Sequence, residues 1–297
     1  MGLLVNPFLF LVFRMKHINP WLILLPALII VGFNSFIPLF YCIYLSTLRY
    51  YIGIGEPTFI GYDNFRKIVF DPGLWNSVAR GFMFSFVCLA IEIPLGLGVA
   101  LLLQRETRGT KLIRTMLTTP LLIPPMTIGC MWLLLVRPDI GPLPRLLSRI
   151  GVMYNIGSSP LLAFWTTVVL DTWHWTPFVI LVLIAGLATL PPEPYESAMV
   201  DGASTWRIFR YITLPGLKYH LAVVILIRLM DTLRIFDEIW VLIAEGPGKA
   251  TNYLSVNIVK TALSELNMGY GAAISLFFVY IVIILSWLIM LFLRERK

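Results

Sequence analysis

Six long apolar stretches, separated by short polar segments, are the feature that most limits what this chain can fold into. A helix that crosses a bilayer needs about 20 mostly apolar residues. Stretches of this kind occupy residues 21–45, 78–103, 112–136, 161–190, 220–243 and 272–293. The sequence therefore predicts an all-α integral membrane protein with six transmembrane helices.

The balance of apolar and charged residues supports this prediction. Hydrophobic residues make up 58% of the 297 residues and charged residues only 13%, whereas about a quarter of a soluble domain is charged. The net charge is +7, but the basic residues lie mostly between the apolar stretches. We therefore expect them to set the topology and to contact the lipid bilayer, and we expect no nucleic acid partner.

The distribution of Lys and Arg predicts the orientation. Twelve of these residues lie in the terminal segments and in the loops on the same side of the membrane as the termini. Nine lie in the longer loops of the other side. Because cytoplasmic loops are enriched in these residues, we expect a multi-pass protein of the cytoplasmic (inner) membrane with both termini in the cytoplasm. Residues 46–76 would form an extracytoplasmic loop, residues 77–293 the core and residues 294–297 a cytoplasmic tail.

Residues 1–20 form an N-terminal segment with two open interpretations. Its apolar part is too short to span a membrane, and its charges follow the apolar run, which is the wrong order for a signal peptide. The segment is either interfacial or the product of a start codon assigned too early, with translation beginning at Met15.

Motifs for catalysis or cofactor binding are missing from the sequence. The nearest approach to a phosphate-binding loop, at residues 246–250, lacks the upstream glycine and the hydroxyl residue. His17, His174 and His220 are far apart, and the three cysteines show no metal-like spacing. We expect no catalytic residues, no metal and no cofactor bound by this chain.

The polar segment 191–218, between the fourth and fifth spans, differs from its surroundings. Its prolines at 191, 192 and 194 end the fourth span and suit the first turn of a new helix. We expect a helix over 195–201, a reversal at Gly202 and a second helix over 204–211 that ends at residues 214–216. Physical reasoning leaves two roles open for this helix–turn–helix, a connector on the membrane surface or a docking element.

The spacing of residues in this segment resembles the EAA-loop signature of ABC importer permeases. Glu196, Ser197 and Ala198 are followed by Gly202 and, after nine intervening residues, by residues 212–215. Ser197 stands where the family has alanine. The resemblance implies the type I ABC importer permease fold and contact with an ATPase through Glu196, Ser197, Ala198, Asp201, Gly202, Ile212, Leu214 and Pro215.

Further segments resemble the carbohydrate branch of the same family: residues 62–65, 234–242, 245–248 and 268–273. This resemblance implies import of a di- or oligosaccharide, or a related polyol or glycerol-phosphate, by alternating access. It also implies a second permease subunit, a dimer of ATPases that holds ATP and Mg, and an extracytoplasmic solute-binding protein.

Charged residues inside the fifth span are candidates for the translocation path. A charge at the bilayer centre costs at least about 2.5–3.5 kcal/mol, so these residues should not face lipid. On a continuous helix they fall on or beside one stripe: Arg228, Asp231, Arg234, Asp237 and Glu238. The alternative roles are a structural ion-pair ladder or, in an ion- or proton-coupled secondary transporter, a proton relay.

A second candidate cluster lies on the fourth span, where aromatic and polar residues suit stacking on sugar rings. It consists of Asp171, Trp173, His174 and Trp175. An interfacial aromatic belt is the alternative. Glu92, alone in the second span, receives no role from the sequence.

Overall fold

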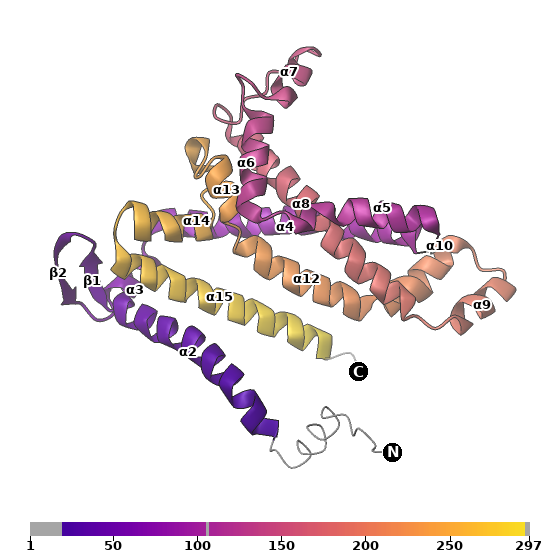
Figure 1. Ribbon diagram of the computed structural model, residues 1–297, viewed down its shortest axis with the longest axis horizontal. Coiled ribbons are helices and arrows are strands. Elements are labelled where there is room, and N and C mark those ends of the chain that lie inside the picture. The colour runs from indigo at the N-terminus through magenta and orange to yellow at the C-terminus, as the bar shows by residue number, and fades with distance from the viewer. Residues whose placement is uncertain (1–19, 105–106, 295–297) are drawn as a thin grey trace, which may run out of the picture.

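The computed structural model describes residues 20–104 and 107–294. Its long helices run side by side, with a β-hairpin at one end (the hairpin end) and helices α9 and α10 at the opposite end (the loop end) (Figure 1). The helices are α2 (Pro20–Ser46), α3 (Asp63–Val69), α4 (Pro72–Leu103), α5 (Arg108–Thr118), α6 (Pro125–Val136), α7 (Pro142–Ser148), α8 (Pro160–Ala188), α9 (Glu193–Val200), α10 (Thr205–Ile208), α11 (Leu214–Gly216), α12 (Lys218–Leu233), α13 (Asp237–Leu242), α14 (Leu254–Val259) and α15 (Met268–Arg294). Short 3-10 segments η2 (Thr119–Leu122) and η4 (Pro247–Lys249), and π segments η3 (Phe209–Thr213) and η5 (Lys260–Ser264), complete the helical elements. The predictions for the N-terminal segment and for most of the C-terminal tail concern residues outside the described ranges.

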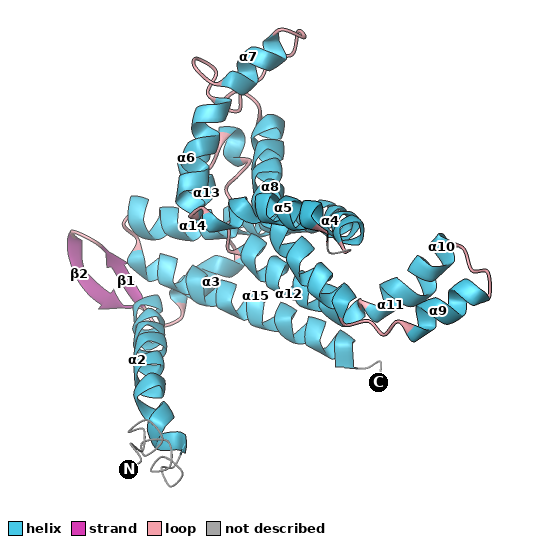
Figure 2. Ribbon diagram, turned by 45° about the vertical axis from the view of Figure 1, so that its right-hand side comes forward, coloured by secondary structure: helices cyan, strands magenta, loops and turns pink. Residues whose placement is uncertain are grey.

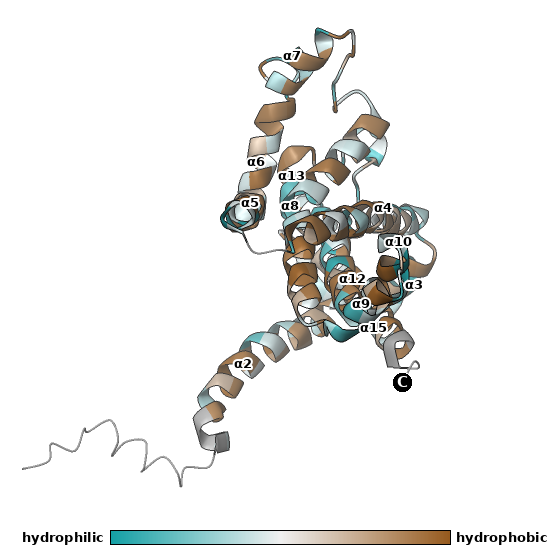
Figure 3. Cartoon of the chain, turned by 90° about the vertical axis from the view of Figure 1, so that its right-hand side faces the viewer, coloured by the Kyte–Doolittle hydropathy of each residue, from teal (hydrophilic) through white to brown (hydrophobic). Residues whose placement is uncertain are grey.

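Within residues 20–104 and 107–294, four helices are long and apolar enough to cross a membrane: α2, α4, α8 and α15. Two bent helix pairs bring the number of spans to six if each pair counts as one. The prediction of six apolar spans is confirmed in this sense. Along α4 most of the ribbon is hydrophobic (Figure 3), as its role as a span requires.

The third span is broken. Helix α5 with η2 and helix α6 meet at an angle of 96°, and Pro124 and Pro125 stand at the break as N-cap and first residue of α6. Proline lacks the N–H that would continue the preceding helix and disfavours helical geometry in the residue before it. The prediction of one helix over 112–136 is therefore wrong. Helix α6 packs against α13, and α7 lies beyond it, away from the long helices (Figures 1 and 2).

The fifth span is also interrupted, at both ends. At its start, α12 meets the helical segment 205–216 at an angle of 62°. At its other end, α12 stops at Leu233, and the next helix, α13, begins at Asp237. The Ser255 hydroxyl donates a hydrogen bond to the carbonyl of Ile235, in the non-helical link between them. The prediction of a continuous helix over 220–243 is wrong beyond Leu233.

The hairpin end contains a small antiparallel sheet that the sequence did not predict. Strand β1 (Leu48–Tyr51) pairs with β2 (Ile54–Phe59), with Leu48 opposite Phe59. The short helix α3 follows the hairpin. Its buried Asn64 donates hydrogen bonds of 2.8 Å to the carbonyls of both Ser46 and Leu48, which ties α3 to the end of α2 and to the sheet.

The centre of the molecule is the packing of α4 against α8 and α12. Gly96 of α4 allows a close approach to α8, because a Cβ at this position would lie 2.6 Å from a methyl carbon of Val179. Apolar side chains on both sides of this contact, including Leu97, Leu183 and Val224, are buried. By contrast, α2 packs mainly against α15 and is largely exposed. The core thus joins three spans and leaves a fourth at the edge.

Candidate functional site

The segment that connects α8 to α12 forms the predicted helix–turn–helix, and backbone geometry explains its turn. The N–H of Gly202 donates to the carbonyl of Met199, and the N–H of Ala203 donates to that of Ala198. This pair of bonds is the Schellman arrangement, which requires a left-handed residue after the helix. Gly202 supplies it with a φ of +73°. The reversal expected at Gly202 is therefore confirmed.

The second half of this segment differs from the prediction. Ser204 caps α10 by accepting a hydrogen bond from the N–H of Arg207. The helix then continues through the π segment η3 and through α11, and it bends into α12 instead of ending at residues 214–216. The Tyr195 hydroxyl donates to Thr213 Oγ1 at 3.1 Å, so α9 is fastened to this continuous helix.

Most of the predicted ATPase contacts lie on the surface of this segment. Exposed side chains and backbone are found at Glu196, Ser197, Asp201, Gly202 and Pro215, whereas Ala198, Ile212 and Leu214 are half-buried. Within the described part of the chain, no ion pair involves Glu196 or Asp201. Both acids are therefore open to a partner.

The predicted stripe of charges in the fifth span is divided by the break after Leu233. Asp231 and Arg234 form the expected i, i+3 pair at 3.1 Å, with Arg234 exposed. Asp237 and Glu238 instead occupy the first turn of α13, where a helix favours negative charge. Asp237 is exposed, but Glu238 is buried. The five charges therefore do not share one face.

Arg228 has a different role, in a cluster that joins three helices. Its Nε and Nη2 each donate to one carboxylate oxygen of Glu92 on α4, both at 2.8 Å. Nη2 also donates to Asp171 Oδ2 on α8 at 2.6 Å. All three side chains are at most 1% exposed, and the ring of Trp175 lies 5.0 Å from the guanidinium carbon. We call Glu92, Asp171 and Arg228 the buried charge cluster.

Glu92 is the residue that reasoning from the sequence missed. It lies in an apolar stretch with no charged residue nearby in sequence, and its partners are 79 and 136 positions away. A signal was nevertheless present, because an acid at the centre of a span needs a basic partner at similar depth. Arg228, near the middle of the fifth apolar stretch, was the candidate for this basic partner.

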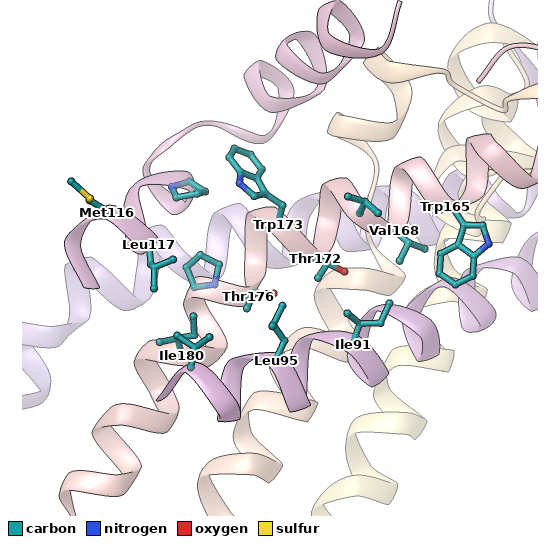
Figure 4. Close-up of a pocket in the computed structure, with 14 residues that line it drawn as sticks. Ile91, Leu95, Met116, Leu117, Trp165, Val168, Thr172, Trp173, Thr176 and Ile180 are labelled. Carbon is teal, nitrogen blue, oxygen red and sulfur yellow. The ribbon is translucent and has the colours of Figure 1, made fainter. Parts of the chain in front are cut away.

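The four residues predicted as a cluster on α8 face three different neighbours. Asp171 and Trp175 contact Arg228, while His174 Nδ1 lies 3.4 Å from Glu238 Oε1. Trp173 lines a cavity of about 500 Å³ between α8, α4, α5 and η2. Figure 4 shows Trp173 beside this largely apolar cavity, with Thr172 and Thr176 on the same helix. The rings of His174 and Trp175 lie 4.8 Å apart, while Trp173 faces the cavity, and the role of these residues in stacking on sugar rings stays a prediction.

Comparison with known proteins identifies the family. The model of the binding-protein-dependent transport system inner membrane component family matches residues 92–297, which include the helix–turn–helix and the buried charge cluster. The chain belongs to this family. It is therefore a multi-pass membrane permease, and the resemblance of residues 196–215 to the EAA loop is accounted for.

Two curated relatives illustrate the similarity of this permease to others. The trehalose/maltose transport system permease protein of Thermococcus litoralis is 34% identical over 271 residues, which cover 91% of this chain and 90% of the relative. The trehalose transport system permease protein of Mycobacterium tuberculosis is 33% identical over 254 residues, 84% of this chain and 80% of the relative.

The fold of this permease is that of a type I ABC importer permease. A chain in the crystal structure of a bacterial ABC transporter for the import of alginate superimposes with a TM-score of 0.81 at 21% identity. The match covers 97% of this permease and 99% of that chain. At this identity the likeness concerns the fold, and the predicted all-α permease fold is confirmed.

Proposed function

We propose that this permease imports a sugar across the inner membrane, driven by ATP hydrolysis on a separate ATPase dimer. It works with a second permease subunit and an extracytoplasmic solute-binding protein, by alternating access. The solute is a di- or oligosaccharide or a related polyol or glycerol-phosphate. The chain itself is not an enzyme.

The sugar proposal rests on the substrate class that the relatives of this permease share. Two relatives at 33–34% identity are named as permeases for trehalose or for trehalose and maltose. A third, from Thermoanaerobacterium thermosulfurigenes, is 28% identical over 93% of this chain and is named a probable starch degradation products transport system permease protein. All three names refer to glucose-based carbohydrates.

The ATPase coupling proposal rests on the exposed helix–turn–helix of residues 191–218, the coupling loop. Its exposed acids lack ion-pair partners among the described residues, and its bent junction with α12 links it directly to the fifth span. Movement of the loop by an ATPase would therefore change the tilt of α12. This assignment places the loop end in the cytoplasm, together with both termini.

The candidate translocation path is a reduced set of the predicted residues. Asp231, Arg234 and Asp237 have accessible side chains, and Trp173 lines the cavity of Figure 4. Accessible polar groups and an aromatic plane are both side-chain types that suit a hydroxyl-rich solute. Arg228, Asp171, His174 and Glu238 are buried and paired in this conformation, so we assign them to the support of the path.

Uptake by the complete transporter in proteoliposomes tests the proposal. The permease, its partner permease, the ATPase and the binding protein are reconstituted with ATP inside, and radiolabelled trehalose and maltose are supplied outside. We expect accumulation of at least one sugar that needs ATP and survives an uncoupler. Uptake that persists without ATP and collapses with the uncoupler would instead support an ion-coupled transporter. ATP-driven uptake of solutes other than sugars would refute the sugar assignment alone.

A further inference from the structure

Two threonines in the middle of α8 differ from the two nearer its start. Thr166 and Thr167 donate hydrogen bonds to carbonyls in the preceding turn of the helix. Thr172 and Thr176 are only 9% and 7% exposed, yet their Oγ1 atoms make no hydrogen bond with any described residue. Both line the cavity of about 500 Å³ shown in Figure 4.

A backbone group beside these threonines also lacks its usual partner. Pro177, which lines the same cavity, has no N–H and cannot donate the helical hydrogen bond to the carbonyl of Trp173, four residues earlier. Two hydroxyls and one carbonyl in the middle of this span are thus without the bonds that a helix usually provides. Within a bilayer, neighbouring helices commonly satisfy the groups that a proline leaves free.

The walls of the cavity opposite α8 cannot satisfy these groups. They carry no hydroxyl, amide or charged side chain and consist of Ile91, Leu95 and Val99 of α4, Met116 and Leu117 of α5, and Pro120 of η2. A lipid acyl chain in the cavity would leave the hydroxyls equally unpaired. A sugar alone would find few partners for its own hydroxyls, which would lose water without replacement.

The cavity has the shape of a groove for a helix. Its lining residues on α8 run from Trp165 to Ile180, about 22 Å of helix rise. Trp165, Val169 and Trp173 are exposed, so the cavity is open along one side of α8, and α5 does not fill it, because no described side chain of α5 is buried. A long apolar groove with a few hydrogen-bonding groups suits a second membrane helix, since packing and interhelical hydrogen bonds hold such helices together.

We infer that the second permease subunit docks on the face of α8 around this cavity. One of its spanning helices fills the groove with apolar side chains and offers a polar group to Thr172 and Thr176. This inference rests on the proposed function, which includes a second permease, and adds the place where that subunit binds. It agrees with the position of Trp173 in the candidate path, because a path shared by two permeases runs along their contact.

Photochemical crosslinking in the assembled transporter tests this inference. Trp165→p-benzoylphenylalanine places a probe at one end of the groove. Phe86→p-benzoylphenylalanine is the matched control, since Phe86 is also aromatic and exposed but lies nine residues before Leu95, on the opposite side of α4. After illumination in proteoliposomes, we expect an adduct of the two permeases, identified by mass spectrometry, from the probe at 165 and not from the probe at 86. An adduct with lipid alone at 165 would overturn the inference.

A second variant tests the two hydroxyls without a bulky probe. Thr172→Val combined with Thr176→Val keeps the side-chain shape, and we expect the two permeases to associate about threefold to thirtyfold more weakly in detergent. Thr189→Val is the control, because that hydroxyl bonds to the Gly186 carbonyl of its own helix, and it should associate like the wild type. Equal association of the double variant and the wild type would overturn the role of the hydroxyls.

These readouts separate the docking face from the sugar proposal. ATP-driven sugar uptake without a permease adduct at position 165 would refute the docking face alone. An adduct at position 165 in a transporter that imports another class of solute would refute the sugar assignment alone.

Discussion

The buried charge cluster and the coupling loop use the same kinds of residue in opposite ways. In the cluster, Arg228 satisfies two acids from two other helices, and all three side chains are buried. In the coupling loop, Glu196 and Asp201 are exposed and form no ion pair with the described residues. The cluster holds spans together inside one chain, while the loop keeps its charges available for another chain.

This difference teaches where substitution should affect stability and where it should affect function. Breaking a buried pair leaves an uncompensated charge in the core. Altering an exposed charge removes little stability, because water replaces the partner. The following predictions test this contrast, from the largest expected effect on stability to the smallest.

Arg228→Gln should cause the largest loss of stability. It leaves two acids without their shared cation, and removal of one partner from a buried ion pair costs about 3–5 kcal/mol. We expect a markedly lower melting temperature of the purified transporter in detergent. Arg234→Gln is the control, since Arg234 is 76% exposed and its pair with Asp231 should contribute less than about 1 kcal/mol.

Equal melting temperatures for the two variants would contradict the distinction between buried and exposed charges. A large loss in Arg234→Gln alone would show that the outer pair, and not the cluster, holds the spans.

Asp71→Ala should have a smaller effect, at the hairpin end and outside the spans. Asp71 caps α4 by accepting hydrogen bonds from the N–H groups of Gly73 and Leu74, and the Tyr270 hydroxyl donates to it at 2.8 Å. Loss of such a cap costs about 1 kcal/mol. Thermal unfolding measured beside Asp63→Ala, an exposed acid at the start of α3, isolates the effect of the cap.

The contribution of Asp71 should also depend on pH. Partial burial raises the pKa of this carboxyl, but hydrogen bonds from Tyr270, Leu74 and Gly73 and the charge of Lys67 outweigh it, so the pKa is lowered. A lowered pKa in the folded state means that the contribution is present above the ordinary carboxyl pKa of about 3.9 and is lost as pH falls below it. A difference between wild type and Asp71→Ala that grows on acidification would contradict this sign.

The sequence was sufficient for the elements that depend on local pattern. Apolar length predicted the spans, and the proline cluster at 191–194 with Gly202 predicted the turn of the coupling loop. Gly202 was informative because a Schellman turn requires a left-handed residue, which is a local requirement.

Features that depend on contacts distant in sequence were not predictable in the same way. The bonds from Arg228 to Glu92 and Asp171 connect residues 136 and 57 positions apart. The break after Leu233 follows from packing, including the bond from Ser255 to the Ile235 carbonyl, and no proline or glycine marks it. The sequence prediction assumed one continuous helix across that break and therefore put Glu238 on the same face as Arg228. In the structure Glu238 lies beside His174.

The measurement that tests the central claim most directly is ATP-dependent uptake and ATPase association in Gly202→Asp. This substitution introduces a side chain at a left-handed residue of the coupling loop, where nothing lies within 4 Å of the new Cβ. Gly151→Asp is the matched control, since Gly151 has a φ of +77°, equally open space and a position beyond α7, far along the chain from the loop. We predict that Gly202→Asp loses most ATPase association and uptake while Gly151→Asp keeps both. Unchanged ATPase association and uptake in Gly202→Asp would contradict the assignment of residues 191–218 as the coupling loop.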